Sequence, residues 1–141
     1  MIILDTDHIT VLQRAETEAA NALRSRLRVS GEDVWLSIPS FEEQMRGWLS
    51  LIGRYSNVRQ QVEYYRRLQA MIPFYGDWRI IAFEKGAADE FLQLRKRKVR
   101  ISSTDLKIAA IAIVNSALLL TRNERDFAKV PELRFEDWLS N

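Results

Sequence analysis

The chain contains no cysteine and a single histidine, His8, among its 141 residues. The lack of cysteine excludes disulfide frameworks, thiolate zinc sites and cysteine nucleophiles. With one histidine the chain also has no site built from several imidazoles. Any metal ion in this protein would therefore be held by oxygen ligands.

Long apolar runs are also absent. No stretch approaches the roughly 20 apolar residues that a helix needs to cross a bilayer. The first five residues, MIILD, lack the basic region and the cleavage site that are typical of a signal peptide. We therefore expect a cytoplasmic protein without membrane contact.

The composition is that of an ordinary globular domain. Roughly 150 residues make an average domain, so we expect one domain that spans residues 1–141. Apolar residues make up 47% of the chain, with four Trp, four Tyr and six Phe among them. These residues are sufficient for a core, and the chain has neither an internal repeat nor a low-complexity linker.

Short apolar runs alternate with longer amphipathic segments along the chain. The short runs predict strands, and they lie at residues 1–4, 34–38, 79–83, 118–120 and 133–135. The longer segments predict helices, which begin near residue 9 and then cover residues 16–29, 40–53, 57–74, 84–98 and 102–117, with a turn and a brief helix at 121–127. Pro73 and Gly76 are expected to close the 57–74 helix. This alternation predicts an α/β sandwich with a mainly parallel sheet.

Acidic or amide side chains follow the predicted strands. They are Asp5 after the first strand, Glu42 and Glu43 after the second, Asp105 at the start of the most apolar helix, and Asn123 and Asp126 after the fourth strand. Ligands of open parallel sheets gather beyond the carboxyl ends of the strands, so we expect these side chains at one edge. Clustered carboxylates raise one another's pKa unless a cation neutralises them. Mg²⁺ or Mn²⁺ fits such a site, because it binds carboxylates, waters and substrate phosphate.

Helix capping is the alternative explanation for each of these carboxylates. Three segments resemble capping boxes: Ser40-x-x-Glu43, Ser102-x-x-Asp105 and Thr121-x-x-Glu124. Acidic residues in a first helical turn are also favoured by the helix dipole. Asp5 fits the capping interpretation least well. Capping does not require one acidic residue beyond each strand, whereas a metal site does.

The net charge of +2 is the sum of opposed regions. Residues 1–45 carry four basic and eight acidic side chains, residues 46–78 carry five and two, and residues 79–100 carry seven and three. The densest basic block precedes Asp105 and consists of Arg95, Lys96, Arg97, Lys98 and Arg100. A solvated helix end would account for this block, but its position beside the carboxylates favours contacts with a nucleic-acid backbone.

Four motifs in order resemble those of the PIN-domain family, and the likeness extends over almost the whole chain. They are MIILDTDHIT at the N-terminus, Glu43-Gln44-Met45-Arg46-Gly47 after a short strand, Ser103-Thr104-Asp105-Leu106 with Ile108-Ala109-Ala110, and Leu120-Thr121-Arg122-Asn123-x-x-Asp126-Phe127. The likeness is greatest to VapC-type toxins of bacterial toxin-antitoxin pairs. The ending at residues 130–138 also resembles the terminal strand of the family.

The resemblance implies a three-layer α/β/α sandwich and a Mg²⁺- or Mn²⁺-dependent endoribonuclease that leaves a 5′-phosphate and a 3′-hydroxyl. It assigns Asp5, Glu43 and Asp105 as catalytic metal ligands. Asn123 and Asp126 both match the more variable fourth position. Glu43 is preferred over its neighbour because only Glu43 has a glycine, Gly47, four residues later. The implied partners are the RNA substrate, a small antitoxin whose tail fills the site, and a second copy of the chain in a homodimer.

Other interpretations remain open at the level of sequence. Residues 54–78, rich in arginine and tyrosine, match no family motif and are a candidate region for partner recognition. Leu4-Asp5-Thr6-Asp7 also resembles the nucleophile motif of haloacid-dehalogenase phosphatases, which would make Asp5 a nucleophile but leaves Glu43 and Asp105 without a role. A PIN-like domain that binds RNA or a partner without cleaving is the non-enzymatic alternative. His8 is interpreted as a helix-face residue, because water activated by a metal ion needs no histidine.

Overall fold

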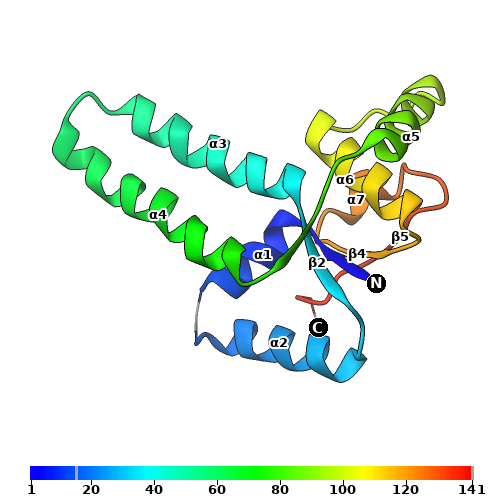
Figure 1. Ribbon diagram of the computed structural model, residues 1–141, viewed down its shortest axis with the longest axis horizontal. Helices are drawn as coiled ribbons and strands as arrows, with labels where there is room; N and C mark the ends of the chain where they lie inside the picture. The colour runs from blue at the N-terminus through cyan, green and yellow to red at the C-terminus, as the bar shows by residue number, and fades with distance from the viewer. Residues whose placement is uncertain (15, 141) are drawn as a thin grey trace.

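The computed structural model describes residues 1–14 and 16–140, and its elements alternate between strands and helices (Figure 1). The strands are β1 (Ile2–Leu4), β2 (Val34–Ser37), β3 (Arg79–Ile81), β4 (Leu118–Leu120) and β5 (Arg134–Glu136). The helices are α1 (Thr6–Gln13), α2 (Glu18–Ser30), α3 (Ile38–Arg54), α4 (Val58–Gly76), α5 (Lys85–Lys96), α6 (Ser103–Val114) and α7 (Glu124–Phe127).

The five strands form one sheet in the order β3-β2-β1-β4-β5, and all four pairings are parallel. The strand β1 lies at the centre, with Leu4 in register with Leu36 of β2 and Leu120 of β4. The carboxyl ends of β1, β2 and β4 therefore meet at one edge. The chain proceeds outward from β1 on one side and from β4 on the other, so the order reverses between these two strands. Ligand sites of parallel sheets form at such a reversal.

Helices cover both faces of the sheet and bury two separate apolar clusters. Residues Ile2 and Leu4 of β1 point toward the side covered by α1 to α4, whereas Ile3 points toward α5 and α6. A strand buried on both faces is apolar at every position, which explains the run Ile2–Leu4. The expected three-layer α/β/α sandwich is confirmed, and its sheet is wholly parallel.

The helix α6 is the most buried of the helices. The side chains of Leu106 and of residues 108–112 are fully enclosed in the cluster against α5 and the sheet. Burying one Leu or Ile side chain stabilises a fold by about 1.5–3 kcal/mol. This burial anchors α6 firmly, and its N-terminal turn carries Asp105 to the edge where the strands end.

Several boundaries differ from those expected. The helices expected at 16–29, 84–98 and 102–117 cover 18–30, 85–96 and 103–114, and the strand expected at 79–83 ends at Ile81. Three further differences have a clear physical reason. The helix α1 begins at Thr6 rather than near residue 9. Ile38 lies in α3 and not in the preceding strand, because the side chain of Ser37 caps that helix by accepting from the Ser40 amide; Ser40 is therefore not the cap. Pro73 lies inside α4, which continues to Gly76. Burial of Met71 and Tyr75, on either side of Pro73, holds the helix together despite the missing amide donor.

The helices α3 and α4 form a long hairpin that projects from the sheet (Figure 1). Large apolar side chains on this hairpin are exposed to solvent, namely Leu49, Val58, Val62, Tyr65 and Ile72. Among residues 1–14 and 16–140, no helix combines the length and apolar character needed to traverse a bilayer.

Candidate functional site

Asp5 lies directly beyond the carboxyl end of β1 and is only 5% exposed. It is the N-cap of α1, where its Oδ1 accepts a hydrogen bond from the Thr6 amide at 2.8 Å. Its Oδ2 accepts from the hydroxyl of Thr121 at 2.7 Å. The expectation that Asp5 fits a capping role poorly is therefore wrong. Both carboxylate oxygens are held by donors, so the plane of the carboxylate is fixed.

The surroundings of Asp5 disfavour its charged form. Burial, followed by the nearby negative charge of Asp7, raises the pKa of Asp5 from 3.8 to about 7. The charge of Asp105 acts in the same direction. A carboxyl pKa raised by burial and by a specific charged neighbour is typical of functional sites.

Thr121 and Asp7 belong to this site, although the sequence analysis gave neither residue a role in metal binding. The Thr121 hydroxyl donates a hydrogen bond to Asp5, and its oxygen accepts one from the backbone amide of Asn123 at 3.0 Å. Asp7 accepts from the Arg122 amide at 2.8 Å, so it holds the same loop. The position of Thr121 directly after a parallel strand is the signal that could have identified it, since Asp5 occupies the equivalent position after β1.

Asp105 lies in the first turn of α6, at the same edge of the sheet. Ser102 caps this helix, and its hydroxyl oxygen accepts from the Asp105 amide at 3.1 Å, as the capping motif predicted. Partial burial, together with the negative charges of Glu43 and Asp126, raises the pKa of Asp105.

Asn123 connects the two carboxylates nearest to it. Its side-chain amide donates to Asp105 Oδ2 at 3.2 Å and to Asp126 Oδ2 at 3.1 Å. The bond from Asn123, aided by the cation of Lys129, lowers the pKa of Asp126. Both candidates for the fourth position are thus adjacent to Asp105.

Glu43 reaches the site from the second turn of α3. It acts electrostatically on Asp105, and its charge adds to burial in raising the pKa of Tyr75. The neighbouring Glu42 instead pairs with Arg46 at 2.7 Å on the exposed side of the helix. This difference agrees with the preference for Glu43 over Glu42.

At this sheet edge Asn123 is hydrogen-bonded to Asp105 and Asp126. The negative charges of Asp5 and Glu43 act on Asp105 without a hydrogen bond to it. Within residues 1–14 and 16–140, however, no three His, Asp or Glu side chains lie close enough together to hold a metal ion. The donor atoms are all oxygen, and the pKa values of Asp5 and Asp105 are raised first by burial and then by neighbouring negative charge. This donor chemistry suits a hard divalent cation such as Mg²⁺ or Mn²⁺.

The basic block borders the acidic cluster on the side of α5. A hollow of about 640 Å³ is lined by Arg95, Lys98, Arg100, Ser102 and Asp126, together with Val99 and Ile101. Lys98 adopts a left-handed backbone conformation (φ 62°), and the Val99 amide donates back to the Leu94 carbonyl at 3.1 Å. This reversal directs the chain after α5 toward the acidic edge.

The remaining two basic residues of the block differ in their surroundings. Arg97 lies 3.7 Å from Glu132, with which it forms an exposed ion pair. Lys96 is exposed at the end of α5 and does not line the hollow. The arrangement thus offers three cations beside the carboxylates, which is chemically suited to an anionic polymer.

The family model described as PIN domain matches residues 2–133. No curated protein sequence matches the chain.

Solved structures resemble the fold over nearly its whole length. One similar structure is VapBC2 from Rickettsia felis, solved bound to a DNA fragment from its promoter. The match has a TM-score of 0.71 at 20% identity and covers 98% of this chain and 99% of the Rickettsia felis chain. FitAcB from Neisseria gonorrhoeae has a TM-score of 0.67 at 26% identity, with 98% and 99% covered. VapC20 from Mycobacterium tuberculosis, described as a sarcin-ricin loop cleaving toxin, has a TM-score of 0.52 at 16% identity, with 92% and 95% covered.

Proposed function

This chain belongs to the PIN domain family, and we propose that it is a Mg²⁺- or Mn²⁺-dependent endoribonuclease that serves as the toxin of a VapBC-type toxin-antitoxin pair. The observation that carries the proposal is the electrostatic coupling of Asp105 with Asp5 and Glu43 at the sheet edge. The neighbouring Asp126 lines a hollow together with three cations. The family match also favours this function over the phosphatase alternative.

In this proposal Asp5, Glu43 and Asp105 hold the cation, and Asn123 or Asp126 supplies the fourth ligand. A bound divalent cation would stabilise charge on a phosphoryl oxygen and promote ionisation of water. The Thr6 amide and the Thr121 hydroxyl keep the Asp5 carboxylate in one orientation. Preorganised ligands of this kind need no rearrangement when charge develops in the reaction.

Metal-dependent RNA cleavage tests the function directly. Purified protein is incubated with a panel of structured RNAs, including a sarcin-ricin loop RNA, in Mg²⁺, in Mn²⁺ or in EDTA. We expect cleavage in either metal and none in EDTA, with 5′-phosphate and 3′-hydroxyl ends on the products. Cleavage that persists in EDTA, or no cleavage of any RNA in either metal, would contradict the proposal and favour a binding role.

The basic hollow would hold the RNA backbone next to the cleaved bond. Arg95, Lys98 and Arg100 line it, whereas Arg97 is paired with Glu132 and Lys96 lies outside. Each phosphate contact contributes about 0.7–0.9 to the slope of log affinity against log salt. We therefore expect Arg95, Lys98 and Arg100 to contribute to RNA affinity and to its salt dependence. Lys96 and Arg97 are expected to contribute little to either.

Replacing either Lys98 or Arg100 with Ala is expected to weaken RNA binding. Each replacement should also reduce the slope of log affinity against log salt by the contribution of about one phosphate contact. Lys96→Ala is the matched control and is expected to leave both quantities unchanged. Binding is measured by fluorescence anisotropy at several salt concentrations, in an Asp105→Asn background that prevents turnover. If Lys96→Ala weakened RNA binding equally, the basic block would act only through its total positive charge, and the proposed contacts in the hollow would be wrong.

The α3–α4 hairpin is the proposed surface for protein partners. A groove of about 420 Å³ on it is lined almost entirely by apolar side chains, which are Phe41, Met45, Tyr65, Leu68, Met71 and Ile72, with Gln69 beside them. Apolar surface of this kind typically marks a protein interface. The likeness to VapBC2 and FitAcB supports an antitoxin partner. A homodimer is the second association that we propose.

A further inference from the structure

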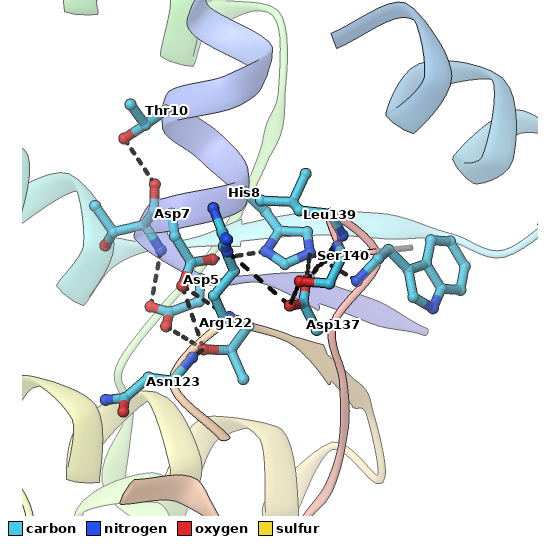
Figure 2. A network of polar contacts seen from close by, with 12 residues as sticks. Asp5, Asp7, His8, Thr10, Arg122, Asn123, Asp137, Leu139 and Ser140 are labelled. Atoms are coloured by element: carbon cyan, nitrogen blue, oxygen red, sulfur yellow. Dashed lines mark hydrogen bonds and ion pairs between the residues drawn. The ribbon is translucent and has the colours of Figure 1, made fainter. Parts of the chain in front are cut away.

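The hydrogen-bonded pair of the partly exposed Asp7 and the buried His8 has no role assigned in the function proposed above. His8 is fully buried, with 0% exposure, and lies in the first half of α1. Figure 2 shows its ring between Asp7 and the segment that contains Asp137. Burial of a polar ring requires partners for both of its nitrogens.

The two ring nitrogens of His8 have different partners, and these fix its tautomer. Nε2 accepts from the Trp138 backbone amide at 3.2 Å, and that amide can only donate. Nδ1 therefore carries the proton, which it donates to Asp7 Oδ1 at 2.6 Å. The imidazole thus links the C-terminal segment to the Asp7 carboxylate.

The other oxygen of Asp7 holds the loop that follows β4. Asp7 Oδ2 accepts from the Arg122 amide at 2.8 Å and lies 3.5 Å from the Thr121 hydroxyl. That hydroxyl in turn donates to Asp5, and its oxygen accepts a hydrogen bond from the backbone amide of Asn123. Asp7 therefore contacts the loop that bonds to Asp5 and contains Asn123, two of the proposed metal ligands.

The C-terminal segment is itself held in place on two sides. Residues 139 and 140 are tied to Asp137 by backbone amides at 2.8 and 3.2 Å. The guanidinium of Arg26 lies 4.1 Å from the centre of the Trp138 ring, and Arg122 Nε lies 4.0 Å from Asp137. The amide that bonds to His8 thus comes from an ordered segment.

We propose that His8 and Asp7 are positioning residues that hold the Thr121–Asn123 loop and the Asp5 carboxylate in the arrangement that binds the divalent cation. The inference rests on the proposed function for its metal, but its first step concerns the loop alone. Outer residues that orient metal ligands typically change metal affinity about 10–100-fold when they are replaced.

Three replacements of His8 separate its two hydrogen bonds from its volume. His8→Asn keeps a donor at the place of Nδ1 and loses the acceptor at Nε2. His8→Gln keeps a polar group toward Trp138 and loses the donor to Asp7, and His8→Leu keeps the volume and loses both bonds. The melting temperature of each variant reports its stability separately.

The metal-free readout is hydrogen exchange of the Arg122 amide, which donates to Asp7. We expect faster exchange of this amide in His8→Gln and His8→Leu, and near-normal exchange in His8→Asn. The second readout is Mn²⁺ affinity measured by electron paramagnetic resonance, with Asp5→Asn as the reference for loss of the site. We expect about tenfold or greater weakening in His8→Gln and His8→Leu, with rescue to within about threefold in His8→Asn.

The two readouts distinguish the inference from the function on which it rests. If Arg122 exchange and Mn²⁺ affinity are the same in all three variants as in the parent protein, the positioning role is wrong and the proposed function is untouched. The same holds if the losses follow the melting temperature rather than the retained donor. If the parent protein binds no Mn²⁺ through Asp5, the proposed function fails and the role in metal binding fails with it, whatever the exchange of Arg122.

Discussion

Asp5→Asn is expected to lower the rate of RNA cleavage by at least about 1,000-fold. The substitution removes one negative charge from the proposed cation site, but its amide can still accept from Thr6 and bond to Thr121. A divalent cation stabilises the charge of a phosphoryl transition state by several kcal/mol, and about 1.4 kcal/mol corresponds to a factor of ten in rate. Loss of the cation therefore removes about three orders of magnitude.

The comparison uses initial rates with one defined RNA at saturating Mg²⁺. Asp105→Asn is expected to behave in the same way, since its carboxylate lies at the same edge. Asp89→Asn is the matched control, because Asp89 is an exposed residue of α5 that pairs only with Lys85 in the described structure. Cleavage by Asp5→Asn at the parental rate would remove Asp5 from the catalytic set.

The Asp5→Asn substitution is also expected to stabilise the metal-free protein at high pH. Burial raises the pKa of Asp5 to about 7, so the folded protein binds a proton at this site more tightly than the unfolded chain does. The free energy of unfolding then falls as pH rises from about 4 to about 7, and the change is on the order of 4 kcal/mol. Asn carries no charge at any pH and does not incur this loss.

Urea unfolding in EDTA at a series of pH values measures the effect. We expect parental protein and Asp5→Asn to have similar free energies of unfolding at pH 4, and the variant to be more stable at pH 8. Asp126→Asn is the control of opposite sign, because the bond from Asn123 lowers the pKa of Asp126 and the variant should gain nothing at pH 8. Parallel pH profiles for parental protein and Asp5→Asn would show that the buried carboxyl is not destabilising.

Most of the fold follows from local patterns in the sequence. The run Ile2–Leu4 is apolar at each position because β1 is covered on both faces, and this pattern alone predicted a strand there. Ser102 predicted the start of α6 because its cap uses only neighbouring atoms. Pro73 misled the prediction for α4, since the burial of Met71 and Tyr75 outweighs the local cost of a proline.

The candidate site was predicted only as far as each residue could be assigned to a strand end. Asp5, Glu43 and Asp105 were selected by their positions in the motifs. Thr121 lies in a capping motif and in the fourth family motif but received no role in the metal site, although its hydroxyl bonds to Asp5 from 116 positions away. A hydrogen bond across such a separation leaves no periodic signal in the sequence.

The amino-acid sequence by itself determined the alternation of strands and helices, the family motifs, and the chemical types of the side chains at the strand ends. These properties depend on contacts between neighbouring residues and on burial patterns that repeat along the chain. The tertiary structure alone decided which of the five cations line the hollow beside the acids. It also decided that His8 joins Trp138 to Asp7, because these contacts bring together residues from opposite ends of the chain.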